Sequence, residues 1–83
     1  MNETTAWMDE KYTQVYEDEL RGLERRRAQD SSCTIRDIEG QLRSFYISQG
    51  NDQEGRGAVG DIVFEATIAA FEHFIAGWKR QGG

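Results

Sequence analysis

The segment from Ile62 to Trp78, IVFEATIAAFEHFIAGW, constrains the fold of this chain more than any other feature. At helical spacing the segment is apolar around most of its circumference, whereas the rest of the sequence is hydrophilic. A helix that is apolar on several sides needs neighbours on several sides. Those neighbours must be the two preceding segments, a second copy of the chain, or a different protein. The segment therefore predicts assembly.

The same segment does not predict a membrane-spanning helix. A bilayer requires about 20 mostly apolar residues. This run is shorter and contains Glu65, Glu72 and His73, each of which is costly in lipid. We expect the helix to be buried by protein.

Length and charge limit the possible partners. A chain of 83 residues has room for a single domain, residues 1–83, with a thin core, because chains of this size bury only about 60 to 65% of the surface that they expose when unfolded. The 15 acidic and 10 basic residues give a net charge of −5. This charge disfavours nucleic acid, anionic membranes and acidic proteins as partners.

The single cysteine and the N-terminal sequence predict a cytoplasmic location. Cys33 cannot form an internal disulfide, and small secreted domains usually carry several cysteines. The first ten residues, MNETTAWMDE, lack the basic flank and apolar run of a secretory signal. Export is therefore not indicated.

Two amphipathic helices are predicted before the apolar segment, over about residues 5–27 and 35–48. Thr34 has the character of an N-cap, with Asp37 three residues later in the spacing of a capping box. Each helix has one apolar stripe at the i, i+3, i+4 spacing. The stripes consist of Met8, Tyr12, Val15, Tyr16, Leu20 and Leu23 in the first helix, and of Ile35, Ile38, Leu42, Phe45 and Tyr46 in the second.

The first helix has acids in its first half and arginines in its last turns, Arg25, Arg26 and Arg27. This order complements the helix macrodipole. We interpret the arginine run as a solvated helix end, not as a phosphate-binding site.

A third helix is predicted over about residues 59–80, and its faces differ. Small residues and His73 share one face, bulky apolar residues form a broad second face, and Glu65, Glu72 and Lys79 form a thin polar stripe. Trp7 lies off the apolar stripe of the first helix and is a candidate interface anchor. The predicted interface consists of Trp7, Val63, Phe64, Ala66, Ile68, Ala70, Phe71, Phe74, Ile75 and Trp78.

The Gly-rich stretch 50–60, GNDQEGRGAVG, is predicted to be the main loop. Residues 55–60 match the GxGxxG pattern, but no strand precedes them and no acid follows at the required distance, so a dinucleotide site is not expected. A calcium loop is not expected either, because Val63 occupies the position of the bidentate glutamate. A speculative site for an anion remains at Arg56, Gly57 and Gly60, near the first amides of the third helix.

His73 is the only histidine, so any histidine-based chemistry depends on it. Glu72 is adjacent and diverges from it by about 100° on a helix, and Ala70 occupies the position where a bundle metal site needs a carboxylate. We expect the His73 ring to pack against a neighbouring helix and to hydrogen-bond a polar group. A pair of His73 side chains across a dimer axis, with Glu72 or Glu65, is the least implausible metal site.

The sequence predicts an all-α fold of three helices, a long N-terminal helix plus a helix-loop-helix hairpin, that forms a helical bundle as a homodimer. No pair of residues predicts a nucleophile with its base, or an acid with a base. The expected function is that of a non-enzymatic adaptor or regulator that acts by protein–protein contact, without a cofactor. The alternative is a bundle that binds a metal or a small anion near His73 or the Gly-rich loop.

Overall fold

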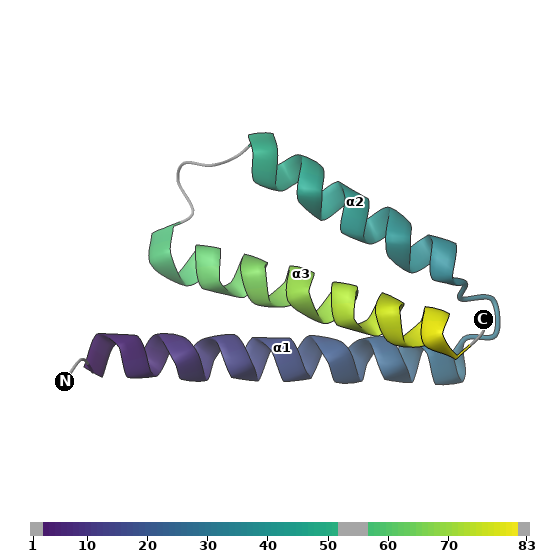
Figure 1. Ribbon diagram of the computed structural model, residues 1–83, viewed down its shortest axis with the longest axis horizontal. Helices are drawn as coiled ribbons and strands as arrows, with labels where there is room; N and C mark the ends of the chain where they lie inside the picture. The colour runs from purple at the N-terminus through teal and green to yellow at the C-terminus, as the bar shows by residue number, and fades with distance from the viewer. Residues whose placement is uncertain (1–2, 52–56, 82–83) are drawn as a thin grey trace.

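The computed structural model describes the backbone of residues 3–51 and 57–81, and the side chains of residues 7–50 and 59–81. These residues form three helices, α1 (Glu3–Gln29), α2 (Ile35–Asn51) and α3 (Gly57–Arg80). No strand occurs in the described ranges. The chain runs along α1, returns along α2, and runs along α3 in the direction of α1 (Figure 1). The predicted all-α fold is confirmed.

The helices are longer than the periodicity predicts. α1 begins two residues earlier, α2 ends three residues later, and α3 begins two residues earlier. The predicted loop 50–60 was therefore too long, because Gly50 continues α2 and residues 57–60 form the first turn of α3. Glycine costs a helix only about 1 kcal/mol relative to alanine, so a few glycines at helix ends do not prevent helix formation. The rest of that predicted loop, residues 52–56, lies outside the described residues.

The connection between α1 and α2 is fixed by local hydrogen bonds. The Thr34 amide donates to the Asp37 carboxylate at 3.1 Å, and the Asp37 amide donates to the Thr34 hydroxyl at 3.3 Å. This reciprocal arrangement confirms the predicted N-cap. Just before it, the amide and hydroxyl of Ser32 both donate to the Asp30 carboxylate, at 3.0 and 2.6 Å. The C-terminus of α1 and the N-terminus of α2 are thereby held close together.

α3 packs along α1 and makes a more limited contact with α2. Ala66 and Ala70 on α3 are fully buried, in agreement with the predicted face of small residues, where helices can approach closely. α2 contacts α3 near the α1–α2 turn and diverges from it toward the opposite end of the molecule (Figure 1). The three helices therefore converge at one end only.

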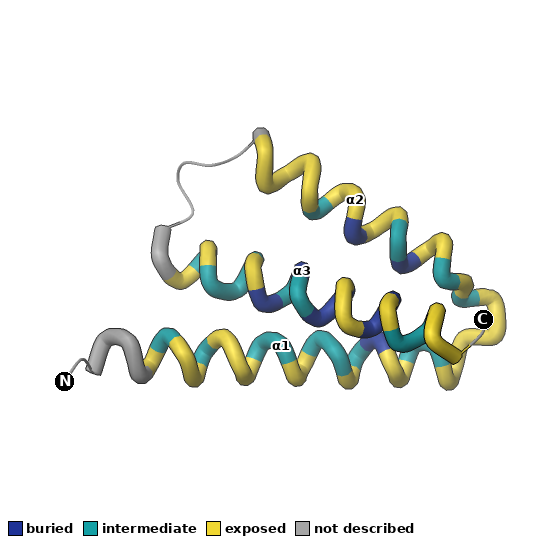
Figure 2. Tube along the Cα trace, in the orientation of Figure 1, coloured by how far each residue is buried: buried dark blue, intermediate teal, exposed yellow. Residues whose placement is uncertain are grey.

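The buried core lies entirely in the half where the helices converge. We call residues 20–42 and 66–81 the closed end, and residues 7–19, 43–50 and 59–65 the open end. Figure 2 shows that the buried positions gather at the closed end and that the far half of α2 is almost wholly exposed. The buried hydrophobic residues are Leu23, Ile38, Leu42, Ala66, Ile68, Ala70, Phe71, Phe74 and Ile75.

Candidate functional sites

The open end presents an apolar surface. Every large hydrophobic side chain that is exposed in the described part of the chain lies in this half, with exposed fractions between 37% and 58%. Phe45 closes part of the space between α2 and α3 through edge-to-face contacts with Phe64 and Phe71, at centroid distances of 5.8 and 5.1 Å. Beyond these rings the core ends. The exposed set consists of Trp7, Tyr12, Tyr46, Ile47 and Val59.

Most of the predicted interface residues are covered by the chain's own helices. Trp7 is exposed, and Val63, Phe64 and Trp78 are half-buried. The remaining six already pack within the single chain, so they offer little surface to a partner in this conformation. That these residues form an interface between chains stays a prediction. The covered residues are Ala66, Ile68, Ala70, Phe71, Phe74 and Ile75.

Ile47 and Val59 are exposed apolar residues that the predicted interface omits. Ile47 lies outside the apolar stripe of α2, and Val59 lies at the edge of the predicted loop. An isoleucine off the buried stripe of an otherwise polar helix is the signal that could have identified this surface from sequence.

The open end also carries opposite charges on its two outer helices. Residues 7–19 of α1 contain five acids and one lysine. Residues 43–50 of α2 contain Arg43 and no acid. The exposed apolar side chains of α1 therefore lie among negative charges, and those of α2 lie beside a positive one.

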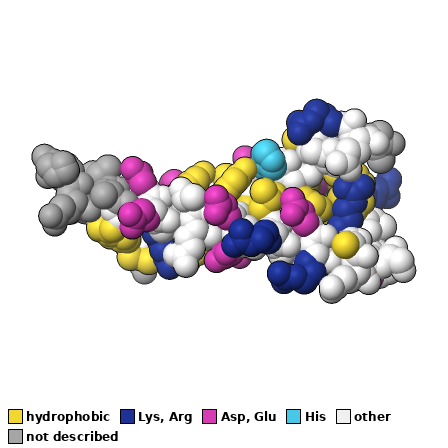
Figure 3. All heavy atoms as spheres, turned by 90° about the horizontal axis from the view of Figure 1, so that it is seen from below, with side chains coloured by type: hydrophobic (Ala, Val, Ile, Leu, Met, Phe, Trp, Pro, Cys, Tyr) yellow, Lys and Arg dark blue, Asp and Glu magenta, His cyan; other side chains and the backbone are white. Residues whose placement is uncertain are grey.

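A groove follows the boundary between α1 and α3, with His73 at its centre. In the space-filling view, the cyan side chain of His73 lies on the surface beside hydrophobic side chains (Figure 3). Toward the open end the groove is a hollow of about 730 Å³ between Tyr12, Tyr16 and Glu72. Toward the closed end it is a hollow of about 530 Å³, which we call the closed-end groove. Its lining consists of Leu20, Glu24, Arg27, Ala28, His73, Phe74, Gly77, Trp78, Arg80 and Gln81.

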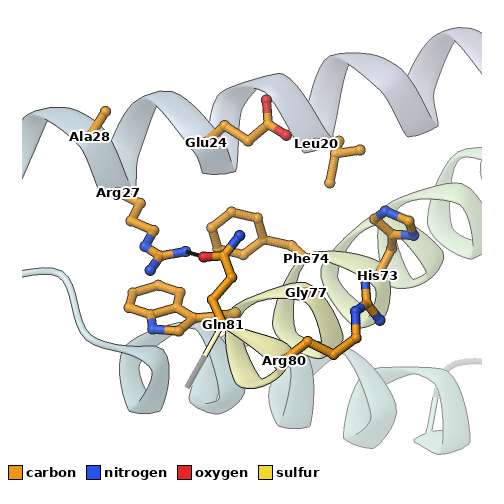
Figure 4. A pocket seen from close by; sticks show the side chains of 10 residues that line it. Leu20, Glu24, Arg27, Ala28, His73, Phe74, Gly77, Arg80 and Gln81 are labelled. Carbon is orange, nitrogen blue, oxygen red and sulfur yellow. Dashed lines mark hydrogen bonds between the residues drawn. The ribbon is translucent and has the colours of Figure 1, made fainter. Parts of the chain in front are cut away.

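Arg27 is held across the closed-end groove by two contacts. Its guanidinium lies 3.9 Å above the Trp78 ring, and its Nη1 donates to the side-chain oxygen of Gln81 at 3.0 Å. Figure 4 shows Arg27 reaching from α1 toward Gln81, which follows the last residue of α3, with Arg80 on the other side of Gly77. Stacking on the ring orders the guanidinium and leaves most of its donors free.

His73 packs as the sequence predicts, but it is exposed. Its ring meets the Tyr16 ring edge-on at a centroid distance of 6.0 Å, and Tyr16 stacks on Tyr12 at 6.4 Å. The predicted hydrogen bond from His73 is not found in the described part of the chain. The ring therefore lies over the α1–α3 boundary.

The residues considered as metal ligands do not converge within one chain, and the pair of His73 side chains across a dimer axis stays a prediction. Within the described side chains, no three of the His, Cys, Asp and Glu residues are placed to hold a metal ion. Glu72 accepts a hydrogen bond from the Tyr46 hydroxyl of α2, and this bond, with a smaller effect of burial, raises the pKa of Tyr46 above its ordinary value of 10.0. Cys33 is half-buried and free, against the core beside the α1–α2 turn.

The speculative anion site at the Gly-rich stretch is only partly described. Gly57 and Gly60 lie in the first turn of α3, whereas the sequence predicted Gly57 to lie in the loop before it. Arg56 lies outside the described residues, as does the C-terminal pair Gly82 and Gly83. The structure therefore does not bring the three predicted residues together into a described site.

Comparisons of the chain with protein-family models, with curated proteins and with solved structures find no match. Within the described residues, no helix combines the length and the apolar character that a bilayer crossing requires.

Proposed function

We propose that this protein acts by protein–protein contact, as a small non-enzymatic adaptor or regulator, and that it works as a two-fold symmetric homodimer joined through the open end. The observation that carries the proposal is the separation of the apolar side chains. The closed end buries them, whereas the open end exposes Tyr46 and Ile47 on α2 and Trp7 and Tyr12 on α1. These side chains lie in the same half of the molecule, on its two outer helices, and exposed apolar surface of this kind is typical of a docking site.

Charge complementarity supports a second copy as the occupant. In a two-fold pair, a contact between α2 of one chain and α1 of the other is made twice. It places Arg43 opposite the acidic segment 7–19 of the partner chain. The nearest acid to Arg43 on α2 is Glu39, one turn earlier, which pairs with Lys79 at 3.0 Å. Opposite charges around an apolar contact favour the correct partner and orientation. The charges of the open end are therefore complementary to those of a second open end.

The dimer leaves a polar outer surface for a further protein. The outer face of α1 is acidic in its first half and rich in arginine in its last turns. A partner that binds there must match this alternation of charge, which disfavours a uniformly acidic protein. Binding surfaces on a folded helical body are sufficient for the function of an adaptor or regulator.

Light scattering tests the proposal. At micromolar concentration the protein is expected to have about twice the chain mass of 9.5 kDa. Ile47→Glu places a charge in the apolar contact, where an unpaired buried charge is strongly unfavourable, so this variant is expected to be monomeric. Gln29→Glu is the matched control, because it adds the same charge at an exposed position of the closed end and should leave the mass unchanged.

Reversing the charges of one proposed contact tests how the two chains are oriented in the dimer. Arg43→Glu is expected to weaken the dimer by about five- to tenfold, and Glu10→Arg should do the same. The double variant should recover part of the loss, because it restores an opposite pair of charges. A wild-type protein that stays monomeric at high concentration would contradict the proposal, as would an Ile47→Glu variant with the wild-type mass.

A further inference from the structure

We propose that the closed-end groove binds an organic carboxylate with an apolar body. All of its lining residues belong to the closed end, so the inference does not depend on the proposed dimer. The groove has about 530 Å³ of space, which falls within the range of about 300 to 1,000 Å³ that is usual for small-molecule sites.

The floor of the groove is apolar. Phe74 is buried against the core and meets Trp78 edge-to-face at 5.7 Å, and Leu20 from α1 packs beside the same cluster. Gly77 has no side chain to fill the hollow, and a Cβ at this position would have the Arg80 guanidinium at 3.8 Å as its nearest neighbour. An aliphatic chain or a ring can therefore lie over Gly77 against apolar side chains.

The rim of the groove is cationic. The contacts of Arg27 with Trp78 and Gln81 fix its plane, and only one of its five N–H donors is used in them. Arg80 has no ion pair or hydrogen bond in the described part of the chain. Two guanidinium groups without carboxylate partners thus lie on one small hollow of a protein whose net charge is −5.

A carboxylate is the anion that best fits these two arginines. A guanidinium can bind a carboxylate through two parallel hydrogen bonds. Glu24 is the one acidic side chain in the lining, and it is exposed and forms no ion pair with either arginine. Its charge and the negative charge of the whole chain oppose a doubly charged ligand more strongly than a singly charged one. A monoanion with an apolar body can bind the arginines of the rim with its charge and pack on the apolar floor with its body.

The probes are hexanoate, 1-hexanol and inorganic phosphate, which separate the charge from the apolar body. In the Trp7→Phe variant the Trp78 indole N–H gives a single NMR signal, which reports on the groove directly. Saturable shifts of this signal are expected with hexanoate, at an affinity about tenfold or more above that of 1-hexanol and of phosphate. Equal affinity for hexanoate and either control would overturn the proposal, as would the absence of a saturable shift up to millimolar hexanoate.

Three groove variants and a control sharpen the test. Arg27→Gln and Arg80→Gln should each weaken hexanoate binding about tenfold, whereas Glu24→Gln should strengthen it several-fold by removing the opposing charge. Arg36→Gln, at an exposed position of α2 outside the groove and outside the proposed dimer contact, is the matched control and should leave hexanoate binding unchanged. Calorimetric titration of the folded variants provides a second readout, since Arg27→Gln also changes the surroundings of the indole. Unchanged affinity in both arginine variants would overturn the proposal.

The carboxylate could belong to a free acid or to the C-terminus of a polypeptide. A short peptide that ends in leucine, with a free carboxylate, is compared with the same peptide as its amide. Tighter binding of the acid peptide than of hexanoate assigns the groove to polypeptide C-termini, whereas tighter binding of hexanoate assigns it to free acids. Equal binding of the peptide acid and its amide would overturn a role for the carboxylate.

Discussion

The closed end of the molecule buries its apolar side chains among three helices, whereas the open end leaves similar side chains in contact with water. Composition does not explain this difference. Ile38 and Ile47 lie on the same helix, yet Ile38 is fully buried and Ile47 is 58% exposed. The difference comes from the course of α2, which packs on α3 from the turn that follows α1 as far as Phe45 and diverges from it toward the other end (Figure 1).

The turn between α1 and α2 explains why the two ends differ. The Thr34 cap and the bonds from Ser32 to Asp30 hold the helix ends together, and Arg26 of α1 donates to the Gln41 side chain of α2 at 2.9 Å. No hydrogen bond or ion pair joins α1 to α2 among the described residues of the open end. The local bonds of one turn therefore decide where the core forms.

The largest expected effect separates the two isoleucines of α2. Ile38→Ala creates a cavity in the core and should lower the free energy of unfolding by about 2 to 5 kcal/mol. Ile47→Ala removes contacts of an exposed side chain and should change it by less than about 0.5 kcal/mol in the monomer. Urea denaturation at a concentration that favours the monomer measures both.

A pair of smaller substitutions, from isoleucine to valine, keeps this comparison measurable if the Ile38→Ala variant does not fold. Ile38→Val should cost about 0.5 to 1.5 kcal/mol, and Ile47→Val should cost almost nothing. Equal losses at the two positions would mean that the open end is as well packed as the closed end.

The second prediction concerns the close approach of helices at the closed end. Ala70→Leu inserts three carbon atoms where alanine is fully buried, and overpacking of this kind costs about 1 to 3 kcal/mol. Ala76→Leu makes the same change at an exposed position of the same helix and should have little effect. Denaturant midpoints for the pair check the packing, and a larger loss for Ala76→Leu would contradict it.

The third prediction concerns the cap that joins α1 and α2. Thr34→Ala removes the hydroxyl that accepts from the Asp37 amide, leaves the 3.0 Å bond from this amide to the Thr34 carbonyl, and should cost about 1 kcal/mol. Thr13→Ala changes an exposed threonine in the middle of α1 and should be neutral, or slightly stabilising, because alanine has the higher helix propensity. Thermal unfolding of both variants distinguishes the cap from a general effect of losing a hydroxyl. A neutral Thr34→Ala would mean that the turn does not fix the closed end.

The smallest expected effects on stability come from one titrating side chain at each end, and they are lost in opposite pH ranges. At the closed end, hydrogen bonds from the hydroxyl and amide of Ser32, with the charge of Arg26, lower the pKa of Asp30 below 3.8. This contribution to stability is present above the unfolded pKa and is lost as the pH falls through the folded value. At the open end, the bond to Glu72 raises the pKa of Tyr46, so its contribution is present below about pH 10 and is lost as the pH rises further.

Melting temperatures across the pH range test these signs. Asp30→Asn should lower the melting temperature slightly at neutral pH, and the difference from wild type should narrow in acid. Tyr46→Phe should lower the melting temperature slightly at neutral pH, and its difference from wild type should disappear in strong alkali. A difference that does not depend on pH in either variant would show that the corresponding bond does not contribute to stability.

Much of the fold follows from the sequence, because local rules determine helices. The stripes of α1 and α2 and the cap at Thr34 come from spacings of three and four residues, which the sequence contains directly. The end of α2 and the start of α3 were predicted less well, since glycine weakens a helix without ending it. The divergence of α2 from α3 depends on how three helices pack in space, and no spacing within one helix reports it.

The candidate sites were predicted only in part. The sequence identified Trp7 as an exposed anchor and His73 as a ring that packs on a neighbouring helix. It did not identify the closed-end groove, because Arg27 and Trp78 are 51 positions apart in the sequence and meet only when α1 packs on α3. The arginine run was interpreted as a solvated helix end, yet Arg27 is half-buried over the Trp78 ring.

The most direct test of the central claim is amide hydrogen exchange, in which wild type is compared with Ile47→Glu at the same concentration. If a second copy covers the open end, exchange in residues 7–19 and 43–50 should be slower in wild type than in the variant. Exchange in the closed end, including residues 35–42 and 66–78, should be the same in both proteins. Equal exchange at the open end, or a difference spread evenly over both ends, would contradict the account.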